Sequence, residues 1–373
     1  MCKFSLRTIA AILALASAAS ALPASAQQIA APKDTAEMAI PRYEARFGRE
    51  RPVIAVVGFN AGTEVTDYVV PYGVLAESRV AEVVALGTGD GPIQMKPALR
   101  FSPQSSIKGF DGRYPDGADY VIVPNVYEGE NDPALREWLR AQAEKGATIV
   151  GICDGVPTLA NAGLLIGRRA TTHWRTIDRL ERKHPETRWV KNRRYVADGR
   201  IITTSGVSAS IPISMALIEA IAGRARAEEV GKRLGVTEWS ALHNSEQFSL
   251  TPRHLLTVLG NKAMFWRHEA LGVEVRPDID EIRLALVADA YGRTRRTQAF
   301  AVAASNEPIA TRRGLTLLPD RVGGRNDAPR TLVPGYEHLP PVHALDASLD
   351  SIASSYGKPT AAFVALTMEY AWK

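Results

Sequence analysis

One stretch at the centre of the chain decides its fold: Ala147-Thr148-Ile149-Val150-Gly151-Ile152-Cys153-Asp154-Gly155. Its first four residues form the apolar run of a buried strand, and a helical pattern follows over 156–165. A Gly-x-Cys-x-Gly turn between a strand and a helix is the thiol version of a nucleophile elbow. There, glycines let the backbone turn sharply and lift one side chain out of the sheet. The stretch therefore predicts a thiol presented at a strand-to-helix turn.

Strand and helix patterns alternate on both sides of this stretch. Alternation at this spacing is typical of a parallel, doubly wound sheet with helices on both faces. We therefore expect an α/β fold with a mostly parallel sheet in a flavodoxin-like sandwich, over residues 52–225. The predicted strands are 53–57, 80–86, 120–124, 147–150 and 201–204, and the predicted helices are 66–78, 133–145, 156–165 and 211–222.

Three further segments lie outside this predicted domain. Residues 27–51 are polar and contain Pro and Ala, which indicates an N-terminal arm. Residues 226–280 indicate a charged helical connector. Residues 281–373 predict a smaller, degenerate α/β half-repeat, because their order of elements echoes the beginning and the end of the first domain. Its predicted elements are a strand over 282–287, a helix over 294–305, a strand over 314–318 and a helix over 360–372.

The first 26 residues have the pattern of a secretory signal peptide. Lys3 and Arg7 precede an Ala/Leu-rich run over 9–22, and Ala24-Ser25-Ala26 forms a small-x-small cleavage site. We expect the protein to be exported, to the periplasm, with an uncleaved anchor as the alternative. The formal net charge of +5 moves closer to zero once the two signal cations leave. A net charge this close to zero predicts no nucleic-acid partner.

The chain contains two cysteines, Cys2 and Cys153. Cys2 lies within the predicted signal, so the exported chain keeps only Cys153. An unpaired cysteine in an oxidising compartment is a buried inert residue, a reactive thiol or an intermolecular link. The histidines show no ligand spacing and no second cysteine supports a zinc site, so we expect no metal and no cofactor.

The motifs around Cys153 resemble the ThiJ/PfpI family of the class I glutamine amidotransferase-like superfamily. The closest likeness is to the branch that contains isonitrile hydratases and the sensor halves of AraC-type regulators. It extends over 52–223, and the region after Arg226 lacks a helix-turn-helix pair. The motifs that carry it are Gly151-Ile152-Cys153-Asp154-Gly155, the segments 159–165 and 167–174, Asp198-Gly199-Arg200 with the following 201–209, and Asp67-Tyr68-Val69-Val70-Pro71 with the following 72–75.

The resemblance implies that Cys153 is a nucleophile, which helix amides and the helix dipole would stabilise as a thiolate. The alternative is that Cys153 is an unreactive small residue buried in a tight turn. Asp67 matches the carboxylate that this branch places beside the thiol to transfer protons, but Asp is also a good helix N-cap. His173 could act as a base, and packing is the favoured alternative for an isolated histidine.

The same resemblance implies an oxyanion site built from backbone groups. The amide of Asp154 and the amide of Asn125 are the expected donors, with Gly151 and Gly155 shaping the turn. Two residues or loops depart from the family pattern, one beside the Cys153 thiol and one at this oxyanion site. An acid stands directly after the nucleophile, where it would raise the pKa of the thiol, and the loop at Asn125 lacks a double glycine.

Together these features predict an exported protein with a cysteine nucleophile that hydrates or hydrolyses a small carbonyl, nitrile-like or isonitrile-like substrate. The alternative is a non-catalytic small-ligand-binding or redox-sensing module of the cell envelope. A scaffold role for the half-repeat is a third hypothesis. Glutaminase chemistry is disfavoured because no His/Glu dyad is recognisable after the elbow. We expect a small-molecule partner, no transmembrane span after signal cleavage, and a homodimer by likeness to the family.

Overall fold

The computed structural model describes residues 40–326, 328–329 and 331–372, which belong to one compact unit. The predicted signal peptide, Cys2 and the first part of the predicted arm lie outside the described residues. The central sheet has the strand order β11-β12-β8-β7-β1-β3-β6. All its neighbours run parallel except β11 and β12. The predicted mostly parallel α/β fold is therefore confirmed.

The strands of this sheet are short and its centre is completely buried. Every residue of β1 is buried, as expected of a strand covered on both faces. The five strands predicted for this domain match the structure to within about two residues at each end. The strand bounds are β1 Val53–Gly58, β3 Glu82–Gly87, β6 Ser105–Ser106, β7 Tyr120–Val123, β8 Thr148–Gly151, β11 Tyr195–Asp198 and β12 Ile201–Thr204.

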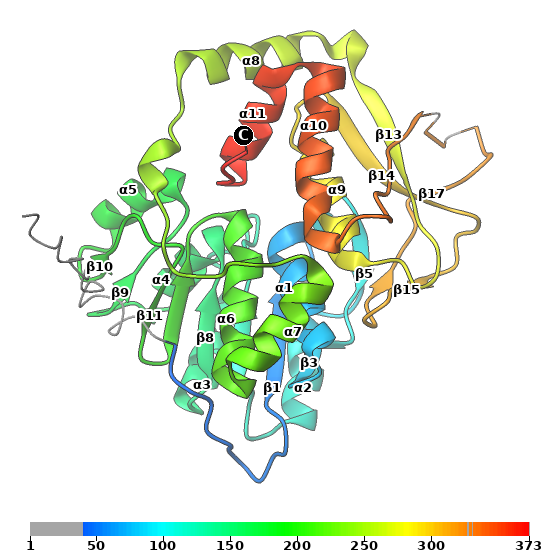
Figure 1. Ribbon diagram of the computed structural model, residues 1–373. Helices are drawn as coiled ribbons and strands as arrows, with labels where there is room; N and C mark the ends of the chain where they lie inside the picture. Colours follow the sequence, from blue (N-terminus) through cyan, green and yellow to red (C-terminus); the bar gives the residue numbers. More distant parts are fainter. Residues whose placement is uncertain (1–39, 327, 330, 373) are drawn as a thin grey trace, which may run out of the picture. The chain divides into compact units, whose positions relative to one another are not determined.

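Helices cover both faces of the sheet, and each face has its own hydrophobic cluster. One cluster includes side chains of α1 (Val65–Ser78), α6 (Ser210–Ala222) and α7 (Arg224–Leu234), which Figure 1 shows on one side of the sheet. The other includes side chains of the helices on the opposite face, which are α2 Ile107–Arg113, α3 Pro133–Glu144, α4 Val156–Asn161 and α5 Trp174–Lys183.

The C-terminal region contains a second parallel sheet, in the order β17-β14-β13-β18. Helix α9 (Glu281–Gly292) connects β13 (Glu269–Glu274) to its neighbour β14 (Thr297–Ala303). This β-α-β unit has the same arrangement as β1, α1 and β3. Strands β17 (Arg321–Val322) and β18 (Thr331–Leu332), and helices α10 (Ala344–Tyr356) and α11 (Lys358–Thr367), complete the region.

Two predictions for this region are wrong. Residues 282–287 belong to helix α9 rather than to a strand, and most of 294–305 is strand β14 rather than a helix. Helix α9 is buried from Glu281 to Tyr291, and a helix buried all round has no polar face to reveal its period. The predicted helical connector over 226–280 contains α7 and α8 (Pro252–Ala263), but also strand β13.

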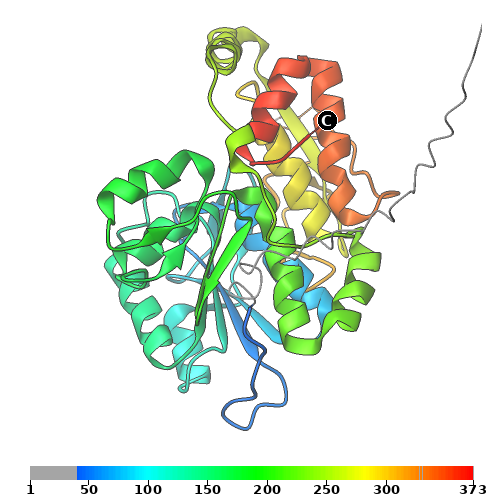
Figure 2. The same cartoon turned by 60° about the vertical axis from the view of Figure 1, so that its left-hand side comes forward.

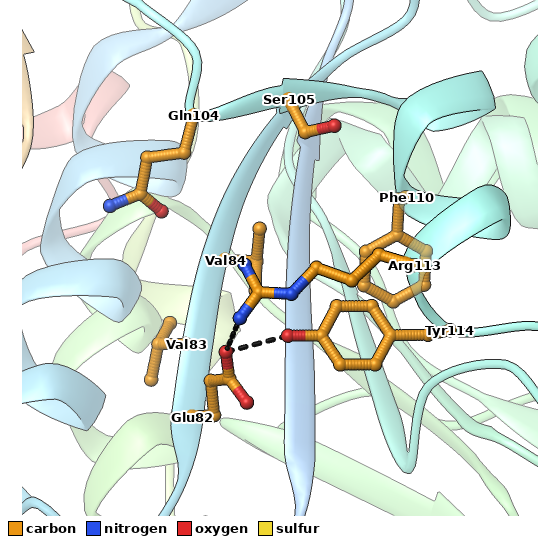
Figure 3. Close-up of a pocket in the computed structure, with 8 residues that line it drawn as sticks. All are labelled: Glu82, Val83, Val84, Gln104, Ser105, Phe110, Arg113 and Tyr114. Carbon is orange, nitrogen blue, oxygen red and sulfur yellow. Dashed lines mark hydrogen bonds and ion pairs between the residues drawn. The ribbon is translucent and has the colours of Figure 1, made fainter.

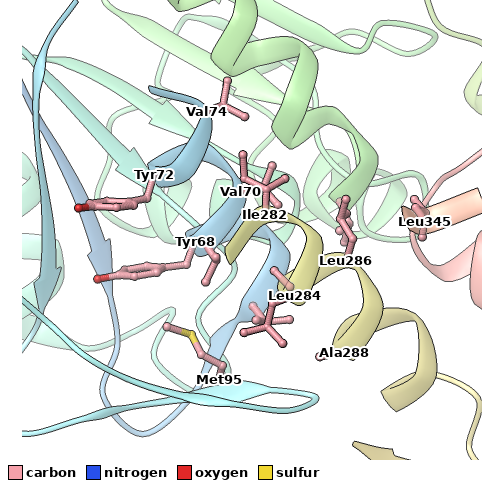
Figure 4. Close-up of a cluster of buried hydrophobic side chains, with 14 of the residues drawn as sticks. Tyr68, Val70, Tyr72, Val74, Met95, Ile282, Leu284, Leu286, Ala288 and Leu345 are labelled. Atoms are coloured by element: carbon pink, nitrogen blue, oxygen red, sulfur yellow. The ribbon is translucent and has the colours of Figure 1, made fainter. Parts of the chain in front are cut away.

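Helices α1 and α9 pack directly against each other and join the two regions (Figure 4). Tyr68 and Val70 of α1 share one buried cluster with Ile282 and Leu284 of α9. A third sheet, which is mixed, also joins the two regions. In it, β16 (Thr316–Leu317) pairs with β5 (Arg100–Ser102) of the first domain. Its remaining strands are β2 Thr63–Glu64, β4 Ile93–Lys96 and β15 Ile309–Ala310.

Candidate active site around Cys153

The strand-to-helix turn at Cys153 has the predicted form. Strand β8 ends at Gly151, a short 3-10 turn spans Cys153–Gly155, and α4 begins at Val156. Cys153 has φ 54°, in the left-handed region that non-glycine residues rarely adopt. Its amide donates a hydrogen bond to Thr204 Oγ1 at 3.2 Å, and its carbonyl accepts one from Thr172 Oγ1 at 3.0 Å. The surrounding structure therefore holds this residue in a strained conformation, as is common at functional sites.

Gly155 is required by the close approach of two chain segments. A Cβ atom on Gly155 would lie 2.2 Å from the carbonyl oxygen of Val123 and 2.7 Å from that of Pro124. Both neighbours are backbone atoms, which cannot rotate away. Gly151 is less constrained, because a Cβ there would meet the Leu159 side chain at 3.0 Å.

Asp67 lies in the first turn of α1 and is completely buried. Its carboxylate accepts hydrogen bonds from the Asn125 amide at 3.3 Å and from Ser210 Oγ at 3.4 Å. The N-cap position of α1 is Glu64, so the structural alternative for Asp67 is wrong. Burial raises the pKa of Asp67 to about 8, against the opposing effects of the Asn125 amide and Arg293. Asp67 is therefore protonated at neutral pH.

The Cys153 thiol is a close electrostatic neighbour of Asp67. Burial raises the pKa of Cys153 well above its usual value, and the charges of Asp67, Asp154 and Glu64 raise it further. This direction is opposite to the one expected from a helix N-terminus. Within the described part of the chain, the thiol makes no hydrogen bond to Asp67. The site therefore holds a neutral thiol beside a neutral acid.

Cys153 opens into a cavity of about 210 Å³. Residues from both regions of the chain line it, so the C-terminal region supplies part of the wall. The lining residues are Glu64, Asn125, Tyr127, Cys153, Asp154, His173, Trp174, Arg175, Val207, Leu250, Arg293, Arg295, Phe363 and Thr367.

Arg293 connects this wall to the first domain through two ion pairs. It binds Glu64 Oε1 through Nη2 at 2.6 Å and Asp289 Oδ1 through Nε at 2.6 Å. Thr66 Oγ1 donates to the other oxygen of Asp289 at 2.7 Å, and Tyr127 donates to Glu64 Oε2 at 2.6 Å. Sequence reasoning missed this network, because Arg293 is far from the elbow in the chain and has no motif around it.

The other predicted site residues have defined places. His173 is the N-cap of α5, where its Nδ1 accepts from the Arg175 amide at 3.2 Å. Its expected structural role is thus present, although it also lines the cavity. The Asn125 amide donates its hydrogen bond to Asp67, so it is not available as the expected oxyanion donor. Asp154 is half-buried, and its Oδ1 is buried without a hydrogen-bond partner among the described residues.

A buried His–Glu pair does occur after the elbow, but neither of its residues lines the Cys153 cavity. His243 Nε2 lies 2.8 Å from Glu369 Oε1, and the second oxygen of Glu369 accepts from the Gly206 amide at 2.7 Å. The pair therefore fastens the C-terminal end of the chain to the turn after β12. Its two members are distant in sequence, so no motif could have revealed it.

A larger cavity, of about 470 Å³, lies at the β3 edge of the sheet (Figure 3). Figure 3 shows Glu82 bound by the two side chains that face it, Arg113 at 2.7 Å and Tyr114 at 2.6 Å. Both donors bind the same carboxylate oxygen, Oε1, and no cysteine or histidine of the described residues lines this cavity. No group of three or more metal-ligating side chains occurs among the described residues. The Cys153 cavity is therefore the candidate site.

The fold and this site define an α/β protein with a cysteine at a strand-to-helix elbow. The family model for the DJ-1/PfpI family matches residues 53–220. Residues 53–220 therefore form a DJ-1/PfpI family domain, and the expected ThiJ/PfpI likeness is confirmed. The match leaves out the region that supplies Arg293, Arg295 and Phe363 to the cavity.

Three curated proteins show how far this similarity extends. The HTH-type transcriptional regulator CdhR of Pseudomonas aeruginosa is 34% identical over 34% of this chain and 40% of its own. The Parkinson disease protein 7 homolog of Danio rerio is 28% identical over 47% of this chain and 93% of its own. The isonitrile hydratase of Pseudomonas putida is 29% identical over 41% of this chain and 65% of its own. The chain thus spans less than two thirds of the regulator and of the hydratase.

Among solved structures, Drosophila melanogaster DJ-1beta matches 50% of this chain and 100% of its own, with 23% identity and a TM-score of 0.46. No helix of the described residues is long and apolar enough to cross a membrane.

Proposed function

We propose that the protein is a cysteine-dependent hydratase or hydrolase of a small carbonyl, nitrile-like or isonitrile-like substrate. One observation carries the proposal. Cys153, held in a left-handed conformation, shares a small cavity with a half-buried carboxylate and lies beside a protonated acid. A nucleophile, a base and an acid are the groups that addition to a polarised carbon needs.

In the proposed reaction the sulfur of Cys153 forms a bond to the electrophilic carbon of the substrate. The S–H proton moves to Asp154, whose unpaired Oδ1 is the base. The electron pair of the substrate's multiple bond moves to its heteroatom, or stays on the isonitrile carbon, and takes a proton from Asp67. Water then displaces the sulfur, and the two carboxyl groups exchange protons in the reverse direction. Because the thiol begins neutral, Asp154 rather than the helix dipole activates it.

Two arginines at the cavity favour a substrate with a negative charge. Arg175 and Arg295 are exposed, and among the described residues their side chains have no hydrogen-bond or ion-pair partner. Arg293 is instead engaged by Glu64 and Asp289. We therefore propose that the substrate is a small anion, since a free guanidinium beside a reacting centre binds a carboxylate well.

The catalytic proposal is tested by turnover of a panel of small aldehydes, nitriles and isonitriles. Cys153→Ser should abolish turnover, and Asp154→Asn should lower kcat about 10²- to 10⁴-fold. Activity should fall above about pH 8 as Asp67 ionises. The exposed Asp116→Asn variant is the control and should behave as the native protein. Full turnover in Cys153→Ser would overturn the mechanism.

The substrate charge is tested by alkylating Cys153 with iodoacetate and with iodoacetamide, which differ only in that charge. Arg175→Gln and Arg295→Gln should each lower the iodoacetate-to-iodoacetamide rate ratio about fivefold, which is the value of one close charge in water. Arg182→Gln, on the exposed side of α5, should leave the ratio unchanged. A ratio equal to that of a free thiol in the native protein would refute the anion proposal.

A second candidate function is a ligand-binding or redox-sensing module. The raised thiol pKa of Cys153 favours its ligand-binding form, because oxidation needs a thiolate. This candidate predicts ligand binding or reversible oxidation of Cys153 with no conversion of any panel member. We also propose that the protein is exported to the periplasm and forms a homodimer. Cleavage after Ala26 in the secreted protein, and a molecular mass measured in solution, test these two proposals.

A further inference from the structure

Helix α8 and the turn after it expose an unusual number of large apolar side chains. We call Leu255, Leu256, Leu259, Phe265 and Trp266 the α8 surface. Their exposed fractions are 52%, 69%, 62%, 71% and 68%. Single exposed apolar residues are ordinary, whereas a contiguous set on one element marks an interaction site.

The three leucines of the α8 surface lie on the side of the helix that faces away from α11. The opposite side packs on α11, where buried Asn261 donates to the Thr294 carbonyl at 2.9 Å and to Thr360 Oγ1 at 3.2 Å. Since an α-helix turns about 100° per residue, Leu255, Leu256 and Leu259 lie roughly opposite Asn261. Figure 1 shows α8 crossing above α10 and α11, and Figure 2 shows it nearly end-on, in yellow-green, at the periphery.

The charged side chains of α8 and of the turn after it all have one sign. By the same helical geometry, Arg253 and Lys262 flank the apolar side on its two edges. Arg267 follows Trp266 in the next turn, and the segment 247–268 contains no Asp or Glu. An apolar face bordered by cations, with Trp and Phe at one end, is the pattern of a helix that lies in a membrane interface.

We propose that the α8 surface docks the protein onto an anionic lipid surface. A second copy of this chain fits less well, because a two-fold contact between two such helices would bring their arginines and lysines together. The helix has only 12 residues, so it lies on a bilayer instead of spanning it. The leucines and aromatic rings enter the headgroup boundary, while the cations contact lipid phosphates. This inference does not depend on the proposed catalysis.

The test is co-sedimentation of the full protein with vesicles of phosphatidylcholine and phosphatidylglycerol in equal parts, and with vesicles of phosphatidylcholine alone. We expect binding to the mixed vesicles that weakens as salt rises. Leu256→Glu should lower the partition coefficient at least about tenfold, because it places a charge at the centre of the apolar face. Arg253→Gln and Lys262→Gln should each lower it about fivefold.

Leu332→Glu is the matched control, because Leu332 is 52% exposed and belongs to a different element, β18. It should bind the mixed vesicles as the native protein does. Circular dichroism confirms that each variant is folded. The proposal is overturned if the native protein does not bind the mixed vesicles, or if the Leu256→Glu and Leu332→Glu variants bind them equally. A stable dimer in solution that Leu256→Glu dissociates, without vesicle binding, would assign the surface to a second copy.

Discussion

At the residue scale, the site combines two groups that burial keeps neutral. Asp67 and Cys153 both lie in the core, and each has a raised pKa because water is excluded from its charged form. Helix amides near Cys153 do not reverse this effect, since three carboxyl groups add to it. The fold therefore keeps the protons on Cys153 and Asp67 and does not stabilise a thiolate.

The raised pKa of Asp67 predicts a pH-dependent stability. The folded state holds the Asp67 proton up to about pH 8, whereas the unfolded chain releases it near pH 3.8. Between these values the folded state binds more protons, so its contribution to stability falls as pH rises, by up to about 1.4 kcal/mol per pH unit. Asp67→Asn should reduce this slope by that amount. Urea unfolding at pH 5, 6, 7 and 8 measures it, with Asp116→Asn as the control. Parallel curves for Asp67→Asn and the native protein would contradict the assignment.

Gly155 provides a purely steric prediction. Gly155→Ala should destabilise the protein by about 3 kcal/mol or more, because the new methyl overlaps two backbone carbonyls. Gly112→Ala, in α2, has no heavy atom within 4 Å of the new Cβ and should stabilise by about 0.5–1 kcal/mol. Urea midpoints give both values. Equal effects of the two substitutions would show that the turn can relax.

At the element scale, local patterns reveal some parts of the molecule and hide others. The elbow at Cys153 and the strands beside it were predictable, because a buried strand and a glycine-bounded turn are local signals. Helix α9 was not, because full burial removes the polar face that distinguishes a helix from a strand. Strand β14 has both exposed and buried positions, so burial does not explain that error. The roles of Arg293 and Glu369 could not be predicted either, because the packing of distant segments determines their partners.

The contact between α1 and α9 depends on Gly73. A Cβ at Gly73 would lie 2.6 Å from Ile282 Cγ1, so the absent side chain lets the two helices approach. Gly73→Ala should cost about 1–3 kcal/mol by overpacking. Ile282→Ala alone should cost about 2–5 kcal/mol by leaving a cavity. The double variant should be more stable than the sum predicts, because the new methyl occupies part of that cavity. Strict additivity in urea unfolding would show that the helices do not meet at this point.

At the scale of the whole molecule, the C-terminal region completes the first domain. It lies outside the matched family domain, yet it lines the Cys153 cavity and pairs α9 with α1. Arg293 is one electrostatic link between the two regions, because its side chain is only 16% exposed and contacts buried Glu64. The DJ-1/PfpI domain of this chain thus shares both its core and its candidate site with the added region.

Removal of the Arg293 charge should therefore destabilise the molecule as a whole. Arg293→Met leaves Glu64 and Asp289 facing each other without a cation, which should cost about 3–5 kcal/mol. The loss should be larger at pH 8 than at pH 5, because the pKa of buried Glu64 is already raised and rises further without Arg293. Glu64→Gln in the Arg293→Met background should restore part of the loss, since it removes one unpaired charge.

Arg276→Met, which breaks an exposed ion pair with Glu337, should cost at most about 1 kcal/mol. Urea unfolding at the two pH values distinguishes these outcomes, and a loss in Arg293→Met no larger than in Arg276→Met would mean that the region is not held by this pair.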